Sequence, residues 1–137
     1  MILTPELLNQ HPVPLSRTLG VEMVEAGPER VVARLKVTAE ICTLGGTLHG
    51  GAMMSLADIA GATGAYISLP KGAVGTTTTE SKTNMISSPP EGAVVIATAT
   101  PVHKGRTSQV WQTRIETEAG KLVSITLQTQ LNLWPKG

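Results

Sequence analysis

Asp58 is the only charged residue in a stretch of small side chains. The stretch GGTLHGGAMMSLADIAGATGAY spans residues 45–66, and no Lys, Arg or Glu occurs from residue 45 to residue 70. Helix faces exposed to solvent usually carry such residues. A carboxylate alone on an uncharged face is therefore a candidate for chemistry, as a nucleophile or as a general base that activates water.

A histidine and two glycines precede the acid, as His49, Gly50 and Gly51. If a helix begins here, its first backbone N–H groups have no acceptor within the helix and favour negative charge nearby. Glycine lets a ligand approach such an N–H group without meeting a Cβ atom. The run could therefore form an oxyanion hole for a thioester or ester carbonyl. An ordinary glycine-rich helix start would show the same pattern.

The small residues predict a helix from about His49 to about Tyr66, with two different faces. Positions three, four and seven residues from Asp58 share its face, and nearly all are small: Gly51, Met54, Ser55, Gly61, Ala62 and Ala65. The opposite face is expected to meet a sheet through Met53, Leu56, Ala60 and Thr63. The face around Asp58 is then smooth enough for a partner helix or a ligand to approach.

The other segments predict one short helix and a set of strands. TPELLNQ, residues 4–10, has capping and proline signals typical of a helix start. Alternating or β-branched runs predict a hairpin and four later strands, over residues 19–26, 30–38, 76–86, 93–102, 107–117 and 121–133. The predicted class is α+β, with one long helix packed on a single face of a sheet.

Length and composition fit one globular domain over residues 1–137. Hydrophobic residues make up 41%, charged residues 15%, and the net charge is +1, so neither nucleic acid nor a membrane is an expected partner. The lone Cys42 favours a reducing cytoplasm. Because Phe is absent, the core is expected to be aliphatic, and the lack of clustered ligands predicts no metal site.

The motif GTLHGGAMMSLADIAGA, residues 46–62, resembles the signature of hotdog-fold acyl-CoA thioesterases of the PaaI-like (phenylacetate-degradation, hydroxybenzoyl-CoA thioesterase) branch. The likeness continues through TTTTESKTNMISSPPEG and through residues 99–130, with the KGRT turn, and covers roughly residues 15–133. It implies a hotdog fold, in which a curved antiparallel sheet of about five to six strands wraps one central helix. It also implies hydrolysis of an acyl-CoA to a carboxylic acid and CoA, without a cofactor.

By position, the resemblance implies roles for residues of the motif. Gly50 would donate its N–H to the thioester carbonyl, Asp58 would be the nucleophile or general base, and His49 would help to hold the loop and the carbonyl site.

Two threonines complete the implied site. Thr78 matches a hydroxyl residue that the family often has near the acid, with Thr77 as a rival position. Thr43 stands where the family often has Asn or Gln to orient water or the thioester, so this chain departs from the pattern there.

CoA carries phosphate groups, and the sequence offers three cations for them. Lys104 and Arg106 lie in the HKGRT turn, and Lys82 lies on the preceding predicted strand. A basic hairpin turn can also be simply solvated.

The spacing within the helix predicts a shared site. Gly50 and Asp58 are eight residues apart, about 12 Å along a helix axis, which is too far for both to reach one thioester. A homodimer with antiparallel helices would place Gly50 of one chain opposite Asp58 of the other, and family dimers carry two such interfacial sites, with pairing into tetramers expected. Two alternatives remain open: an acyl-thioester hydratase or dehydratase, and an acyl-CoA-binding protein without turnover.

Overall fold

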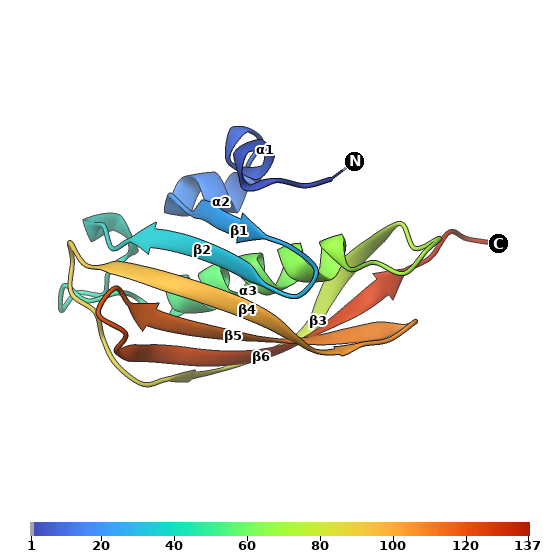
Figure 1. Cartoon of the computed structure of the whole chain (residues 1–137). Coiled ribbons are helices and arrows are strands. Elements are labelled where there is room, and N and C mark those ends of the chain that lie inside the picture. The colour runs from blue at the N-terminus through green and yellow to red at the C-terminus, as the bar shows by residue number, and fades with distance from the viewer. Residues whose placement is uncertain (1) are drawn as a thin grey trace.

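The computed structural model describes residues 2–137. In this range an antiparallel six-stranded sheet curves around the long helix α3 (Gly50–Ile67), as Figure 1 shows. The strand order is β1-β2-β4-β5-β6-β3, with β1 (Glu22–Ala26), β2 (Val31–Lys36), β3 (Gly75–Met85), β4 (Val94–Lys104), β5 (Ser108–Thr117) and β6 (Leu122–Leu133). This arrangement confirms the predicted hotdog fold, and α3 and the last four strands lie within about two residues of their predicted bounds.

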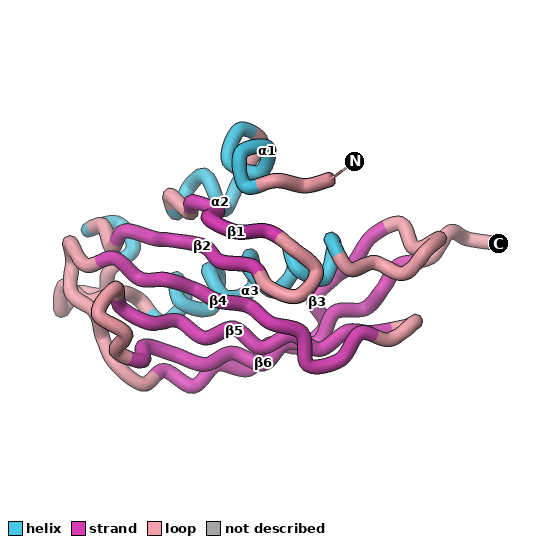
Figure 2. The backbone as a smooth tube through the Cα atoms, viewed as in Figure 1, coloured by secondary structure: helices cyan, strands magenta, loops and turns pink. Residues whose placement is uncertain are grey.

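Two short helices precede the sheet and lie above β1 (Figure 2). The first, α1 (Pro5–Gln10), begins as predicted, because the Thr4 side chain accepts a hydrogen bond from the Leu7 N–H. The second, α2 (Pro14–Leu19), was not predicted, since the prolines around Val13 indicated only a break. Pro14 occupies the first turn of α2, where a missing N–H is tolerated, and Gly20 ends the helix with φ at 83°.

Strand β3 is an edge strand that contains a bulge. It pairs only with β6, and the pairing shifts between Thr78 and Glu80. Before the shift Thr78 lies opposite Gln130, and after it Glu80 lies opposite Thr129. The bulge leaves Thr76 and Thr78 half-buried and Glu80 exposed.

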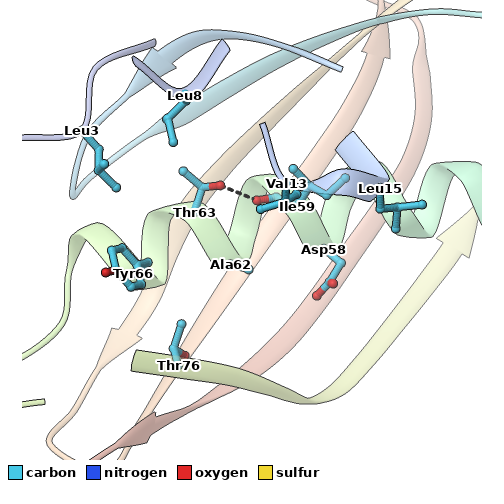
Figure 3. A pocket seen from close by; sticks show the side chains of 10 residues that line it. All are labelled: Leu3, Leu8, Val13, Leu15, Asp58, Ile59, Ala62, Thr63, Tyr66 and Thr76. Carbon is cyan, nitrogen blue, oxygen red and sulfur yellow. Dashed lines mark hydrogen bonds between the residues drawn. The ribbon is translucent and has the colours of Figure 1, made fainter. Parts of the chain in front are cut away.

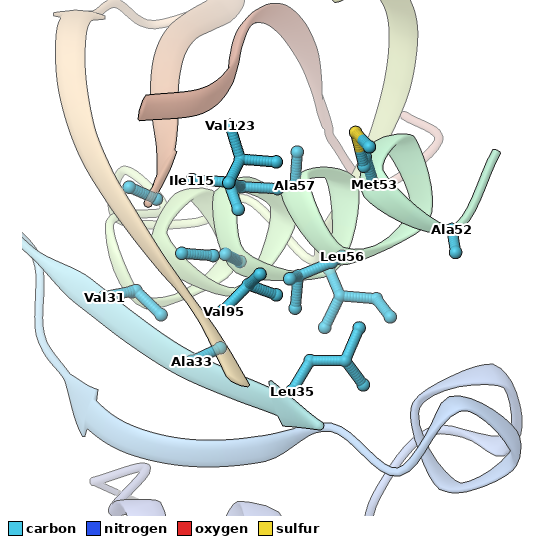
Figure 4. Close-up of a cluster of buried hydrophobic side chains, with 14 of the residues drawn as sticks. Val31, Ala33, Leu35, Ala52, Met53, Leu56, Ala57, Val95, Ile115 and Val123 are labelled. Atoms are coloured by element: carbon cyan, nitrogen blue, oxygen red, sulfur yellow. The ribbon is translucent and has the colours of Figure 1, made fainter. Parts of the chain in front are cut away.

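The core lies between the inner face of the sheet and α3 (Figure 4). Most of it is aliphatic, as the sequence predicted, with Leu35, Leu56 and Ile115 among its fully buried side chains. The prediction of a purely aliphatic core was wrong, because Trp111 is also fully buried. Its indole fits where a helix residue has no side chain: a Cβ atom on Gly64 would lie 2.5 Å from the Trp111 ring.

The faces of α3 differ in part from the prediction. Met54, Ser55, Asp58 and Ala62 are half-buried, as expected for an outer face. However, Gly61 and Ala65 are buried against the sheet, and Thr63, which was predicted to meet the sheet, is half-buried at a surface pocket. Curvature of the sheet explains the difference, because the sheet also covers the side of α3 that carries Gly61 and Ala65, which lie against Gln128 and Gln109. Gly61 and Gly64 therefore make room for the side chains of Gln128 and Trp111 on the sheet.

Within residues 2–137, α3 and the shorter helices lack the length and apolar character needed for a helix that crosses a bilayer.

Candidate active site

The carboxylate of Asp58 points from α3 toward β3 and β6 and is held there by two side chains. The Thr78 hydroxyl donates to Asp58 Oδ1 at 2.6 Å, and the Gln128 amide Nε2 donates to the same oxygen at 3.0 Å. Among residues 2–137, no group donates to the second oxygen, Oδ2. The carboxylate therefore has one oxygen fixed by the protein and one oxygen free to act on a ligand.

A chain of hydrogen bonds continues from this pair along the sheet. Gln130 Nε2 donates to the Thr78 hydroxyl at 2.6 Å, and the Thr76 hydroxyl donates to Gln130 Oε1 at 3.0 Å. In each of these hydrogen bonds, the donor lies farther along the network from Asp58 than the acceptor does. This order fixes the orientation of the Gln130 amide group. Because the Thr78 oxygen accepts from Gln130, the Thr78 hydroxyl donates its own proton to the Asp58 carboxylate.

Sequence reasoning identified Thr78 but missed Thr76, Gln128 and Gln130. The available signal was an alternation of amides along one strand, since Gln128, Gln130 and Asn132 are all buried polar residues on β6. Alternate residues of a strand share a face, and a row of amides facing a helix needs partners. Thr77, the rival of Thr78, is exposed.

Gly61 makes the contact between Gln128 and Asp58 possible. A Cβ atom at Gly61 would lie 2.3 Å from Gln128 Oε1, so any larger residue would displace the amide. Gln128 is 1% exposed, and its Oε1 has no hydrogen-bond partner within residues 2–137. A buried unpaired carbonyl costs about 1–3 kcal/mol. The position of Gln128 is therefore explained by its amide group, which serves Asp58.

Asp58 lies in the wall of a pocket of about 480 Å³ between α3 and the N-terminal helices (Figure 3). Most of the lining is apolar, and it consists of Leu3, Leu8, Val13, Leu15, Asp58, Ile59, Ala62, Thr63, Tyr66 and Thr76. This volume is in the range of small-molecule sites, which combine apolar walls with a few placed polar groups. The pocket therefore combines mostly apolar walls with one carboxylate, that of Asp58.

His49 and the two glycines form the N-terminus of α3. His49 is the N-cap, and its Nδ1 accepts the Gly51 N–H at 2.8 Å. An accepting Nδ1 places the proton of a neutral imidazole on Nε2. The Gly50 N–H has no acceptor within residues 2–137. One of the two glycine donors is therefore used inside the protein, and the other is free for an external oxygen.

The structure of one chain does not bring the two halves of the predicted site together. The pocket of Asp58 contains neither Gly50 nor His49. Thr43 lies in the turn before the helix, where its N–H donates to Thr47 O at 2.8 Å, and its side chain is exposed. Thr43, His49 and Gly50 thus belong to one end of α3, and Asp58 belongs to its middle.

The three predicted phosphate-binding cations differ in their surroundings. Lys104 is paired with Glu29 and also donates to Pro28 O. Arg106 lies over the Trp134 ring, with 4.4 Å between its guanidinium carbon and the ring centroid. Lys82 is exposed on β3. None of the three lines the pocket of Asp58.

Cys42 is a poor candidate for a nucleophile. Its Sγ donates to Thr38 O at 3.2 Å. Burial raises the pKa of the Cys42 thiol, and the nearby Glu91 and Glu40 carboxylates raise it further. Because the thiolate is the reactive form, Asp58 remains the stronger candidate for chemistry.

Comparisons with known proteins identify the family of this chain. The thioesterase superfamily model matches residues 45–124, more than half of the chain. The 1,4-dihydroxy-2-naphthoyl-CoA hydrolase of Listeria monocytogenes serotype 1/2a (strain 10403S) is 34% identical over 82% of this chain and 89% of its own length. The residues matched by the family model include His49, Gly50, Asp58 and Thr78 but not Gln128.

Solved structures give the same result. Thioesterase HI1161 of Haemophilus influenzae is 30% identical, with a TM-score of 0.88, over 98% of this chain and 95% of its own. A mutant of the phenylacetic acid degradation protein PaaI from Thermus thermophilus is 27% identical, with a TM-score of 0.81, over 88% of this chain and 100% of its own. The chain therefore belongs to the thioesterase superfamily, in its PaaI-like hotdog-fold branch, and is a thioester hydrolase.

Proposed function

We propose that this protein hydrolyses acyl-CoA thioesters and that Asp58 is its catalytic carboxylate. The observation that carries the proposal is the state of Asp58, which lies in the wall of an apolar pocket with Oδ1 held by Thr78 and Gln128 and Oδ2 free. The name of the Listeria relative, a CoA-thioester hydrolase, supports the substrate class. An apolar pocket beside a carboxylate suits an acyl group whose thioester carbon is to be attacked.

The reaction needs one water molecule. Either Asp58 removes a proton from water, whose oxygen attacks the thioester carbon, or Asp58 attacks that carbon itself and water later releases the acid. In both routes the carbonyl oxygen becomes negative, the C–S bond breaks, and the CoA thiol leaves with a proton. A free N–H at the positive end of a helix stabilises the developing charge. We assign this donor to Gly50 and a loop-holding role to its neighbour His49.

The complete site is proposed to form between two copies of the chain. Eight residues separate Gly50 and Asp58, or about 12 Å along α3. The pocket lined by Asp58 does not include Gly50, and the pocket lined by His49 and Gly51 does not include Asp58. The half-buried outer face of α3 and the unpaired edge of β3 offer surfaces for a second copy. Thr43, in the loop before the helix, would then reach the partner's Asp58 together with Gly50. Pairing of two dimers into a tetramer, in the cytoplasm, completes the proposal.

The substitution Asp58→Asn tests the catalytic assignment. Asn keeps an oxygen that can accept from Thr78 and Gln128, so we expect the fold and the thermal midpoint to change little. Loss of the carboxylate should lower kcat by at least 100-fold, measured by thiol release from a panel of acyl-CoAs. A folded variant with near-normal turnover would show that another group does the chemistry. Inactivity of the wild type toward the whole panel would refute the acyl-CoA substrate.

A further inference from the structure

We propose that the acyl group is an unsubstituted, medium-length hydrocarbon chain and that the N-terminal helices set its length. The inference rests on the proposed function, because it takes Asp58 as the point where the thioester lies. It goes further by naming the chemical class of the acyl group. Three observations support it: the chemistry of the pocket walls, the length of the pocket, and the way its roof is attached.

The walls of the pocket offer few groups that could recognise a polar substituent. Six of the ten lining residues are aliphatic. The Thr63 hydroxyl already donates to Ile59 O at 2.7 Å, and the Thr76 hydroxyl donates to Gln130. Tyr66, about half exposed at one end, is the only other lining residue with a donor. A carboxylate or ketone on the acyl group would therefore lose water without gaining a donor from this chain, which costs free energy.

The same walls disfavour an aromatic acyl group. Aromatic rings gain from stacked or edge-to-face contacts with other rings. Tyr66 is the only aromatic side chain in the lining, and it is about half exposed. A flexible aliphatic chain fits an aliphatic groove without such partners.

The length of the pocket follows from its position on α3. Asp58 and Tyr66 both line it, eight residues apart on the helix, which is about 12 Å along the axis. A fully extended chain of single bonds covers roughly 3.5 Å for every three bonds. The pocket therefore accommodates an extended acyl chain of about eight to ten carbons, with its carbonyl at Asp58 and its end near Tyr66.

The roof of the pocket comes from residues 3–15 and is fixed to the sheet. Leu3, Leu8, Val13 and Leu15 face α3 across the cavity in Figure 3. The side chain of Asn9 anchors this segment, since its Nδ2 donates to Met23 O at 2.9 Å and its Oδ1 accepts from Met23 N at 2.7 Å. Because both bonds go to the backbone of β1, the roof is held at a defined height above α3. The roof residues line the same groove as Asp58 and Tyr66, so a larger side chain on the roof would shorten the space for the acyl chain.

The first test measures kcat/KM of the wild type for saturated acyl-CoAs of two to sixteen carbons, with benzoyl-CoA, phenylacetyl-CoA and suberyl-CoA. We expect a maximum at about eight to ten carbons. Suberyl-CoA, which ends in a carboxylate, should be at least 100-fold worse than octanoyl-CoA. An added hydroxyl should cost about 10- to 100-fold, since apolar pockets reject it only weakly. A flat profile, or a preference for an aromatic acyl-CoA, would overturn the inference.

The second test compares two neighbouring leucines of α1. Leu8 lines the pocket, whereas Leu7 is half-buried on the same helix and lines none of it. Leu8→Trp should lower kcat/KM for decanoyl-CoA at least tenfold more than for acetyl-CoA and should move the optimum to shorter chains. Leu7→Trp should keep the wild-type profile. Identical profiles for both variants would contradict the assignment of the roof, and if Leu8→Trp does not fold, the wild-type profile alone decides.

A binding measurement separates this inference from the proposed function. Octyl-CoA thioether has no carbonyl and cannot be hydrolysed, and calorimetry gives its affinity for wild type and both variants. Tight binding that Leu8→Trp weakens, in a protein without turnover, would refute the hydrolase proposal and keep the acyl pocket. If the protein hydrolyses acyl-CoAs but neither binding nor kcat/KM depends on the length of the acyl chain, the hydrolase proposal is kept and the inference about the acyl group is refuted.

Discussion

Gln128 and Asp58 are joined across 70 positions of sequence by one hydrogen bond of 3.0 Å. A carboxylate only accepts, so the Gln128 amide must turn its NH₂ group toward Asp58 and its oxygen toward α3. That oxygen remains buried without a partner among residues 2–137. The sheet therefore bears a local cost in free energy to fix the direction of the carboxylate that we assign to catalysis.

Gln128→Met tests whether this contact positions Asp58. Met fills a similar volume but cannot donate, so Asp58 should lose one of its two restraints. Hydrogen bonds to charged groups contribute about 1.5–3 kcal/mol, and we expect kcat to fall about tenfold with KM changed less than twofold.

Gln109→Met is the matched control. Gln109 is also a fully buried amide of the inner sheet, but its Nε2 donates to Ala65 O and Asn132 Oδ1 rather than to Asp58. We expect this variant to lower the thermal midpoint and to keep the wild-type kcat. If both variants lose kcat in proportion to their lost stability, Gln128 only supports the fold.

Gly64→Ala should destabilise the protein without a direct effect on the site. The added Cβ atom would lie 2.5 Å from the buried Trp111 ring, which cannot move without disturbing the core. Overpacking of this kind costs about 1–3 kcal/mol, measurable by urea unfolding. Gly27→Ala is the control, because its Cβ atom would meet only Arg30 O at an ordinary 3.6 Å. Equal stability of the two variants would mean that the indole has room to shift.

Two inactive variants should restore activity to each other if the site is shared between copies. Gly50→Pro removes the proposed N–H donor, and Asp58→Asn removes the carboxylate. After random exchange of subunits, half of the dimers are mixed, and each has one intact site of two by symmetry. Activity should return to about a quarter of the wild type. If a pull-down with two tags proves exchange and activity stays at zero, the site lies within one chain.

Arg106→Ala tests the proposed contact with CoA phosphate. If the exposed guanidinium binds phosphate, its loss should raise KM for acyl-CoA and leave kcat unchanged, the pattern of lost uniform binding. The same variant should hydrolyse acyl-pantetheine, which lacks the nucleotide, like the wild type. Arg114→Ala is a control, since Arg114 is paired with Glu116 on the same strand. Equal losses on both substrates would assign Arg106 to its stacking on Trp134 instead.

The sequence predicted those parts of the molecule that depend on local order. The glycine-rich helix, the capping Thr4 and the acid at position 58 follow from neighbours a few residues apart, and Thr78 followed from the resemblance to a family. The bond between Gln128 and Asp58 could not be predicted in this way. It requires β6 to pack against α3, and this contact between distant segments is set by the whole sheet.

Two further errors in the prediction concern helix α2 and the side chain of Thr63. Helix α2 has only six residues between Val13 and Gly20, so it is too short to show a hydrophobic period. Thr63 was assigned to the sheet side by its position on a helical wheel. A wheel assumes a flat partner, but the curved sheet reaches around α3 to Gly61 and leaves Thr63 at the pocket.

The bulge in β3 determines whether the carboxylate of Glu80 lies near that of Asp58 on α3. With unbroken register, the strand that pairs Thr78 with Gln130 would bring Glu80 opposite Gln128, on the face of the sheet that points inward. A second carboxylate would then stand beside Asp58 and compete for the same amide. The extra residue at Thr79 instead directs Glu80 to solvent. The bulge in this edge strand thus keeps a single acid at the site, and loss of the bulge with Thr79 retained would place Glu80 beside Asp58.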